Sequence, residues 1–204
     1  MSAPTTPFRI LVVCTGNICR SPLVETLWRT RLDPHYVELA SAGTRALVDH
    51  AMPDEAQALA VTHGVPADVA GEHRARQLTA ELIAEADVVI ALAREHRADV
   101  VRTLPVAARK TVTLLEAARL VESLADAPHL DVPQLRTLPV ADALRELVPL
   151  ALAERGVAAP PADPLDDDVV DPYRQAPEVY ARSGEQIADA TTRILTALQR
   201  LADR

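Results

Sequence analysis

The chain has 204 residues, 49% of them hydrophobic, and a formal net charge of −8. We expect a short flexible tail over residues 1–6 and a single folded domain over residues 7–204. Because no segment concentrates Lys or Arg, we expect neither a nucleic-acid partner nor an anionic membrane partner. The first residues lack a basic signal-peptide region, and only two cysteines are present, so we expect a reducing, cytoplasmic location.

The pattern along the chain alternates between short apolar runs and helical periodicity. Strands are predicted over 8–14, 36–41, 88–91 and 111–114, and helices over 22–32, 53–63, 79–86, 94–104 and 177–201. Strands separated by helices predict an α/β fold, with three α/β/α layers around a four-stranded parallel sheet.

This rhythm breaks over residues 116–165, where we predict a helical insertion. The segments 116–125 and 140–156 have helical patterns, and the connections beside them are rich in proline. The segment is too long for a plain loop and too poor in apolar residues for an independent domain.

The stretch RILVVCTGNICRSP, residues 9–22, reads as a buried strand, a tight loop and the start of a helix. Gly16 and Asn17 suit positive φ angles, and Pro22 suits the first turn of a helix with Ser21 as its N-cap. Such a loop directs several backbone N–H groups at one point, where the helix N-terminus adds partial positive charge. The arrangement predicts a site for a tetrahedral oxyanion.

Within this loop, Arg20 can hold two phosphate oxygens with its planar guanidinium. Cys14 lies at the base of the loop, where the helix end and the cation favour a thiolate aimed at phosphorus, and Ser21 can donate a hydrogen bond to it. A Cys-x5-Arg-Ser pattern also occurs by chance, with a structural cysteine and a surface arginine. The strand before the loop and the helix after it favour the phosphate site.

Four motifs together resemble the low-molecular-weight protein tyrosine phosphatase family. They are VVCTGNICRSP at 12–22, SAGT at 41–44, GEHRARQLT at 71–79 and DPY at 171–173. The resemblance covers the chain except its first six residues and the insertion. It implies a cofactor-free enzyme that hydrolyses phosphotyrosyl proteins through a phosphocysteine intermediate.

The resemblance also implies roles for individual residues. Cys14 would be the nucleophile, Arg20 would hold the phosphate, and Asp171 would protonate the leaving oxygen and then activate water. Residues implied in phosphate binding and in support of the loop are Thr15, Gly16, Asn17, Ile18, Cys19, Ser21, Ser41 and His73. Among these, Asn17 would hold the strained loop through Ser41, and His73 would join the same network.

Some assignments stay open. Asp163, Asp166, Asp167 and Asp168 compete with Asp171 as the general acid. Cys19 would either form a reversible disulfide with Cys14, as the family implies, or be a small buried side chain. The six histidines show no ligand spacing, so no metal is expected.

Departures from the family concern the substrate. Leu47, Tyr173 and Arg174 are expected at the rim, where only Tyr173 is aromatic. Ile18 is typical of tyrosine phosphatases, whereas relatives acting on phosphoarginine tend to have threonine there. The alternatives to a tyrosine phosphatase are an arginine phosphatase, an arsenate reductase and a catalytically weak phosphate-binding module.

The insertion is the largest departure from the family, and we expect it to pack near the rim and to restrict or recruit protein substrates. Partners would be phosphorylated proteins and a cognate tyrosine kinase. The chain itself would be a monomer or a weak dimer.

Overall fold

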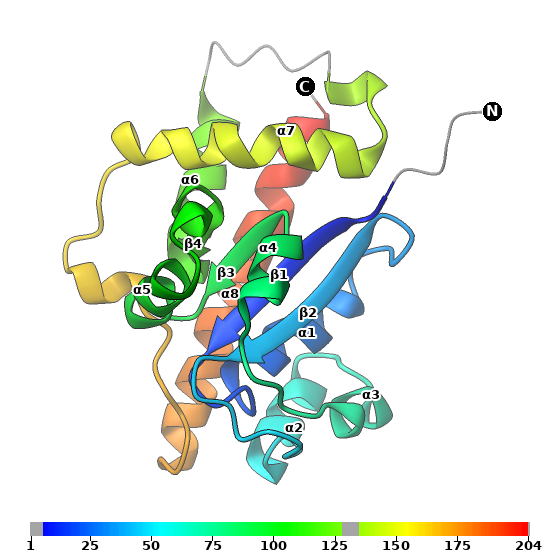
Figure 1. Ribbon diagram of the computed structural model, residues 1–204, viewed down its shortest axis with the longest axis vertical. Helices are drawn as coiled ribbons and strands as arrows, with labels where there is room; N and C mark the ends of the chain where they lie inside the picture. The colour runs from blue at the N-terminus through cyan, green and yellow to red at the C-terminus, as the bar shows by residue number, and fades with distance from the viewer. Residues whose placement is uncertain (1–5, 128–134, 204) are drawn as a thin grey trace.

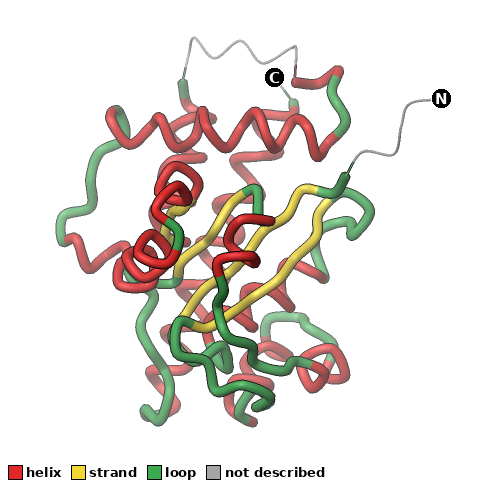
Figure 2. Tube along the Cα trace, in the orientation of Figure 1, coloured by secondary structure: helices red, strands yellow, loops and turns green. Residues whose placement is uncertain are grey.

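A computed structural model describes residues 6–127 and 135–203. The predicted tail, apart from Thr6, lies outside these residues. The four strands are β1 (Phe8–Cys14), β2 (Val37–Gly43), β3 (Val88–Ala91) and β4 (Thr111–Thr113). They form one parallel sheet in the order β2-β1-β3-β4. The sheet lies between helical layers, which confirms the predicted three-layer α/β/α fold (Figure 1, Figure 2).

Eight α-helices are found in the described residues. They are α1 (Arg20–Arg29), α2 (Asp54–Thr62), α3 (Ala67–Glu72), α4 (Ala80–Glu85), α5 (Arg94–Thr103), α6 (Leu114–Asp126), α7 (Val140–Ala153) and α8 (Pro177–Ala202). Short 3₁₀ turns are η1 (Pro105–Lys110), η2 (Leu135–Thr137), η3 (Glu154–Gly156) and η4 (Pro164–Asp167). Within the described part of the chain, no helix is long and apolar enough to cross a membrane.

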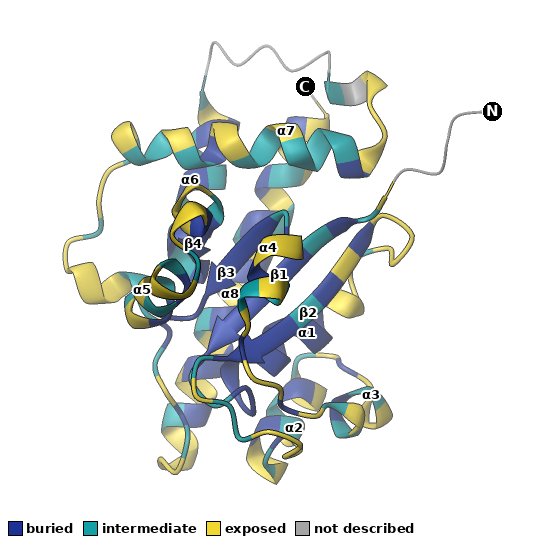
Figure 3. Ribbon diagram, viewed as in Figure 1, coloured by how far each residue is buried: buried dark blue, intermediate teal, exposed yellow. Residues whose placement is uncertain are grey.

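The alternation of side chains along β1 builds two hydrophobic cores. Ile10, Val12 and Cys14 face the core that includes α1, α6 and α8, whereas Leu11 and Val13 face the core under α4 and α5. Nearly the whole of β1 and β3 is buried (Figure 3). A buried central strand gives the loop that follows Cys14 a rigid base.

Two helices begin earlier than predicted. Helix α1 starts at Arg20 rather than Pro22, and Ser21 is not its N-cap because its hydroxyl contacts groups of the preceding loop. Helix α6 starts at Leu114, directly after β4, because Thr113 and Glu116 form a capping box there. The six-residue α3 was not predicted.

The insertion does not pack where it was expected. Helix α6 packs along α8 and belongs to the core. Helix α7 crosses the amino end of the sheet, opposite to α2 and α3 (Figure 1). There the Arg145 guanidinium donates to the carbonyl oxygens of Thr6 and Pro7, just before β1, and to Asp87, just before β3. The expected position of the insertion near the rim is therefore wrong for α7.

The end of β2 approaches the loop after β1 so closely that only glycine fits. A β-carbon on Gly43 would lie 2.5 Å from the carbonyl oxygen of Thr15 and 2.9 Å from the Cα of Ala46. Because both neighbours are backbone atoms, no side-chain rotation relieves the clash. Gly43 thus holds the second strand against the loop.

Replacing Gly43 with alanine is expected to lower the free energy of unfolding by about 1–3 kcal/mol, because the backbone must shift to admit the methyl group. Urea denaturation measures the change. Gly156→Ala is the matched control, since its β-carbon would meet no atom within 4 Å. Equal stability of the two variants would contradict the close approach.

Candidate active site

A small cavity lies at the carboxyl end of β1, where the sheet order reverses direction and α/β proteins commonly bind ligands. Its volume is about 150 Å³. Its lining consists of Cys14, Thr15, Gly16, Ile18, Cys19, Arg20, Arg45, Leu47, Asp171 and Tyr173. The structure therefore brings the predicted nucleophile, cation and acid together with two of the predicted rim residues.

Cys14 has its sulfur surrounded by hydrogen-bonding groups. The Sγ atom lies 3.0 Å from the Ser21 hydroxyl and accepts a hydrogen bond from the Asn17 backbone N–H at 3.3 Å. The residue is buried, and its side chain lies at the floor of the cavity. Because the Ser21 oxygen already accepts from the Asn17 side-chain amide, its own proton is free to bond to this sulfur.

Arg20 lines the same cavity as this sulfur and is only 4% exposed. Its Nη1 donates to the carbonyl oxygen of Val169 at 3.2 Å, and its Nη2 donates to the Thr15 hydroxyl at 3.3 Å. Nη2 also lies 2.8 Å from the Asp171 Oδ2. No side chain caps the start of α1, so the partial positive charge of the helix end also faces this cavity.

The backbone conformation and the side-chain hydrogen bonds of Asn17 support the loop. Its φ of 55° is the only positive one between Cys14 and Arg20, so Gly16 does not adopt the positive φ that was expected for it. The Asn17 side-chain amide donates to the hydroxyls of Ser21 (2.9 Å) and Ser41 (2.8 Å). The predicted tie between Asn17 and Ser41 is therefore present.

His73 joins the same network, as expected. Its Nε2 lies 2.7 Å from the carbonyl oxygen of Asn17. Burial lowers the pKa of His73, against the opposing effect of Glu25, whose carboxylate lies 3.9 Å from Nδ1. The Ser41 hydroxyl donates to the same carboxylate. Glu25 is buried on α1, and sequence reasoning missed it because one glutamate in a helix gives no signal of its own.

Asp171 is the only described aspartate that lines the cavity. Its second oxygen, Oδ1, accepts from the backbone N–H of Tyr173 at 3.2 Å, so the turn at residues 171–173 holds the carboxylate in place. The side chain of Asp171 is half exposed, whereas Arg20 beneath it is buried. The carboxylate can therefore leave Arg20 for solvent or for a substrate.

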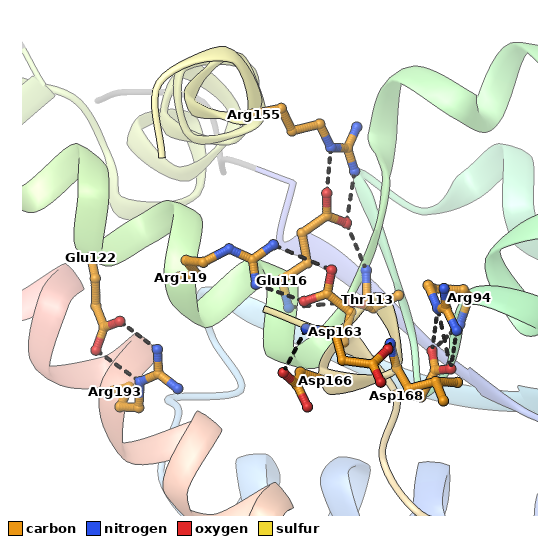
Figure 4. A network of polar contacts seen from close by, with 12 residues as sticks. Arg94, Thr113, Glu116, Arg119, Glu122, Arg155, Asp163, Asp166, Asp168 and Arg193 are labelled. Atoms are coloured by element: carbon orange, nitrogen blue, oxygen red, sulfur yellow. Dashed lines mark hydrogen bonds and ion pairs between the residues drawn. The ribbon is translucent and has the colours of Figure 1, made fainter. Parts of the chain in front are cut away.

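The four competing aspartates have other partners (Figure 4). Asp163 and Asp166 close a capping box around η4, Asp167 pairs with Arg119, and Asp168 accepts hydrogen bonds from the backbone and guanidinium of Arg94. Asp167 and Asp168 thus tie the chain that precedes Asp171 to α6 and α5, whereas Asp163 and Asp166 contact only the turn η4.

A family model described as "Low molecular weight phosphotyrosine protein phosphatase" matches residues 9–134. The chain belongs to this family. The match contains the loop from Cys14 to Arg20, whereas α7, α8 and Asp171 lie beyond it. Among curated proteins, the low molecular weight protein-tyrosine-phosphatase Etp of Escherichia coli (strain K12) is 44% identical over 103 residues. This alignment covers 50% of the chain and 66% of Etp, just under two thirds of the relative.

Solved structures of similar fold extend the likeness to nearly the whole chain. The tyrosine phosphatase Wzb from Escherichia coli K30, in complex with sulphate, has a TM-score of 0.63 and 26% identity, with 95% of this chain and 99% of Wzb covered. The YwlE arginine phosphatase from Geobacillus stearothermophilus also has a TM-score of 0.63 and 26% identity, with 95% and 94% covered. The likeness thus includes both a tyrosine and an arginine phosphatase.

The rim of this phosphatase-family cavity carries positive charge. Leu47 and Tyr173 line it, and the guanidinium of Arg174 lies 5.0 Å from the centre of the Tyr173 ring, at a cation–π distance. Sequence reasoning missed Arg45, which lines the cavity and makes no ion pair within the described residues. Its position directly after the SAGT motif was the available signal.

Both cysteines are free and buried. Burial raises the pKa of Cys19 to about 12, and the neighbouring Cys14 adds to this effect. Cys19 is therefore a neutral thiol at physiological pH. The disulfide between Cys14 and Cys19 stays a prediction.

A larger cavity of about 860 Å³ lies at the other end of the sheet, under α7. Its lining is mainly aliphatic and includes no cysteine, serine or histidine. The size of this cavity does not make it an active site, because it lacks a nucleophile and a buried cation. Among the described residues, no group of three side chains suited to holding a metal is present.

We expect Asn17→Gly to lower the free energy of unfolding by about 2–3 kcal/mol, because two buried serine hydroxyls each lose a hydrogen bond and the backbone N–H of Arg76 loses its acceptor. Asn17→Ala should lower the free energy of unfolding by about 1–2 kcal/mol more than Asn17→Gly does, since alanine must also adopt a positive φ. Urea denaturation of both variants separates the two effects. Equal stability of the glycine and wild-type proteins would argue against the network.

Proposed function

We propose that this protein is a protein-tyrosine phosphatase that hydrolyses phosphotyrosyl proteins without a cofactor. The observation that supports this most directly is the geometry of Cys14 and Arg20. The sulfur lies at the floor of a cavity with two hydrogen-bond donors behind it, and a buried guanidinium lies beside it. A tetrahedral dianion fits between a nucleophile and a fixed cation in this arrangement.

In the first step, the Cys14 thiolate attacks phosphorus in line with the aryl oxygen. The new S–P bond forms as the P–O bond to the tyrosine ring breaks, and Asp171 gives its proton to the leaving oxygen. Arg20, the backbone N–H groups of the loop and the end of α1 stabilise the negative charge on the equatorial oxygens. The products are a free tyrosine side chain and phosphocysteine.

In the second step, water attacks the phosphocysteine. Asp171, now a carboxylate, takes a proton from the water as the O–P bond forms and the S–P bond breaks. Inorganic phosphate leaves, and the Cys14 thiolate is restored with its hydrogen bonds from Ser21 and Asn17. Because the incoming phosphate competes for Arg20, binding also releases Asp171 from its ion pair to act as the acid.

Cys14→Ser is expected to abolish phosphate release from phenyl phosphate, while inorganic phosphate still binds to the loop. The serine hydroxyl is a poor nucleophile without an adjacent base. Colorimetric phosphate release measures turnover, and calorimetry measures binding. A wild-type protein that binds phosphate but releases none from any aryl phosphate would instead be a phosphate-binding module.

Asp171→Asn should lower kcat on phenyl phosphate by about 10²–10³-fold, because the leaving phenolate then departs without a proton. The loss on p-nitrophenyl phosphate should be much smaller, since nitrophenolate is stable without one. Asp163→Asn is the matched control, because Asp163 caps η4 away from the cavity. An equal loss on both substrates would remove Asp171 from the general-acid role.

The charge at the rim favours phosphotyrosine over phosphoarginine. A phosphoarginine side chain brings a guanidinium to a rim that already carries Arg45 and Arg174, and Ile18 offers the entrance an apolar wall. An aryl ring can pack on Leu47 and Tyr173 without that repulsion. A phosphoarginine peptide turned over faster than a phosphotyrosine peptide would reverse this choice. Arsenate reduction is the weaker alternative, because the chain has only two cysteines.

The partners would be phosphorylated proteins, including a cognate tyrosine kinase. A reducing compartment such as the cytoplasm suits a reactive thiolate. We expect the protein to act in this role as a monomer or as a weak dimer.

A further inference from the structure

His96 is a buried histidine beneath the phosphate-binding loop, and neither the sequence motifs nor the proposed steps use it. It lies in the first turn of α5 and is fully buried. Its Nε2 lies 2.8 Å from the hydroxyl of Thr15, and that hydroxyl accepts the hydrogen bond from Arg20 Nη2 at 3.3 Å. The three side chains thus form a line from α5 to the guanidinium.

The protons on Arg20, Thr15 and His96 limit which of these side chains can donate a hydrogen bond to which. A guanidinium only donates, so the Thr15 oxygen accepts from Arg20 and has its own proton left to give. The neutral imidazole of His96 can accept that proton at Nε2. The other ring nitrogen, Nδ1, has no hydrogen-bond partner in the described residues. The contacts of the ring are therefore made at Nε2, where the Thr15 hydroxyl is its hydrogen-bond partner at the shorter distance.

The surroundings keep the ring neutral. Burial lowers the pKa of His96 to about 4, and the nearby guanidinium groups of Arg20 and Arg45 contribute in the same direction. The carboxylates of Asp99 and Asp168 act to raise the pKa of His96, but their effect is smaller than that of burial and the arginines. The exposed carboxylate of Glu95 lies 3.4 Å from Nε2. At any pH above about 5 the ring is neutral and carries one proton, and its Nε2 can pair with the Thr15 hydroxyl, whose oxygen and proton can each form a hydrogen bond.

We propose that His96 is a positioning residue, which hydrogen-bonds the Thr15 hydroxyl through Nε2 and so keeps the Thr15 oxygen directed at Arg20. This inference rests on the proposed phosphatase function. Thr15 at Nη2 and the Val169 carbonyl at Nη1 then fix the plane of the guanidinium from two sides. A fixed plane matters most in the transition state, where the equatorial oxygens carry the developing charge.

Four variants of His96 and Thr15 test this role. In His96→Leu the hydrogen-bonding nitrogen is lost, and in His96→Gln an amide group, which can accept or donate, replaces it near the Nε2 position. Thr15→Val removes the hydroxyl, and the double variant Thr15→Val/His96→Leu tests whether the two act in series. His35→Leu is the matched control, because His35 is exposed and lies between α1 and β2 at the other end of the sheet.

His96→Leu should lower kcat on phenyl phosphate about tenfold with a KM within twofold of wild type, and His96→Gln should restore most of the loss. Affinity for vanadate, which mimics the transition state, should fall by the same factor as kcat/KM, whereas affinity for inorganic phosphate should change less. The double variant should be no slower than Thr15→Val alone. Thermal unfolding of each variant reports on folding separately.

Additive losses in the double variant would overturn the proposal, as would equal losses of phosphate and vanadate affinity in His96→Leu. Should His96→Leu fail to fold, His96→Asn takes its place, since its shorter amide cannot reach Thr15 and should behave like the leucine variant. A wild-type protein that binds both anions without turnover would overturn the proposed phosphatase function. The vanadate-to-phosphate affinity ratios of the glutamine and leucine variants would then still decide the role of His96.

Discussion

The burial of one guanidinium beside one sulfur at the end of β1 is the constraint on which the rest of the site depends. Arg20 and Cys14 both lie below the protein surface, where a charge without partners is costly. The surrounding structure supplies those partners as the Val169 carbonyl, the Thr15 hydroxyl and the carboxylate of Asp171. Thr15 belongs to the loop itself, whereas Val169 and Asp171 come from the segment just before α8, so the site forms only when the two ends of the domain come together.

This constraint explains why support for the loop extends so far from it. Asn17 adopts a positive φ, and its side chain and carbonyl are bound by groups from α1, β2 and the segment after α3. Gly43 lets β2 approach within contact distance of the loop backbone. The carbonyl oxygens of the loop accept from the backbone N–H groups of residues 44, 45 and 47, so the segment after β2 also holds the loop.

The insertion contacts the chain that leads to Asp171, although most of the insertion lies away from the small cavity. Asp167 and Asp168, which directly follow the insertion, pair with Arg119 on α6 and Arg94 on α5 and so fix the chain just before Val169 and Asp171. Helix α7 meanwhile clamps the start of β1 and β3 through Arg145. Helices α6 and α7 of the insertion thus contact the chain before the acid loop and the start of the sheet, and neither helix lines the small cavity.

The sequence by itself determined the strand-loop-helix at the start of the chain, the parallel sheet and the candidates Cys14, Arg20 and Asp171, because these depend on local residue order and on motifs. It could not choose the course of α7 or the start of α1, since α7 is placed by an arginine that reaches two distant strands and Ser21 is used by the loop. The roles of Glu25 and His96, both buried, were equally hidden. A buried polar residue acquires its role only from the partners that tertiary packing brings to it.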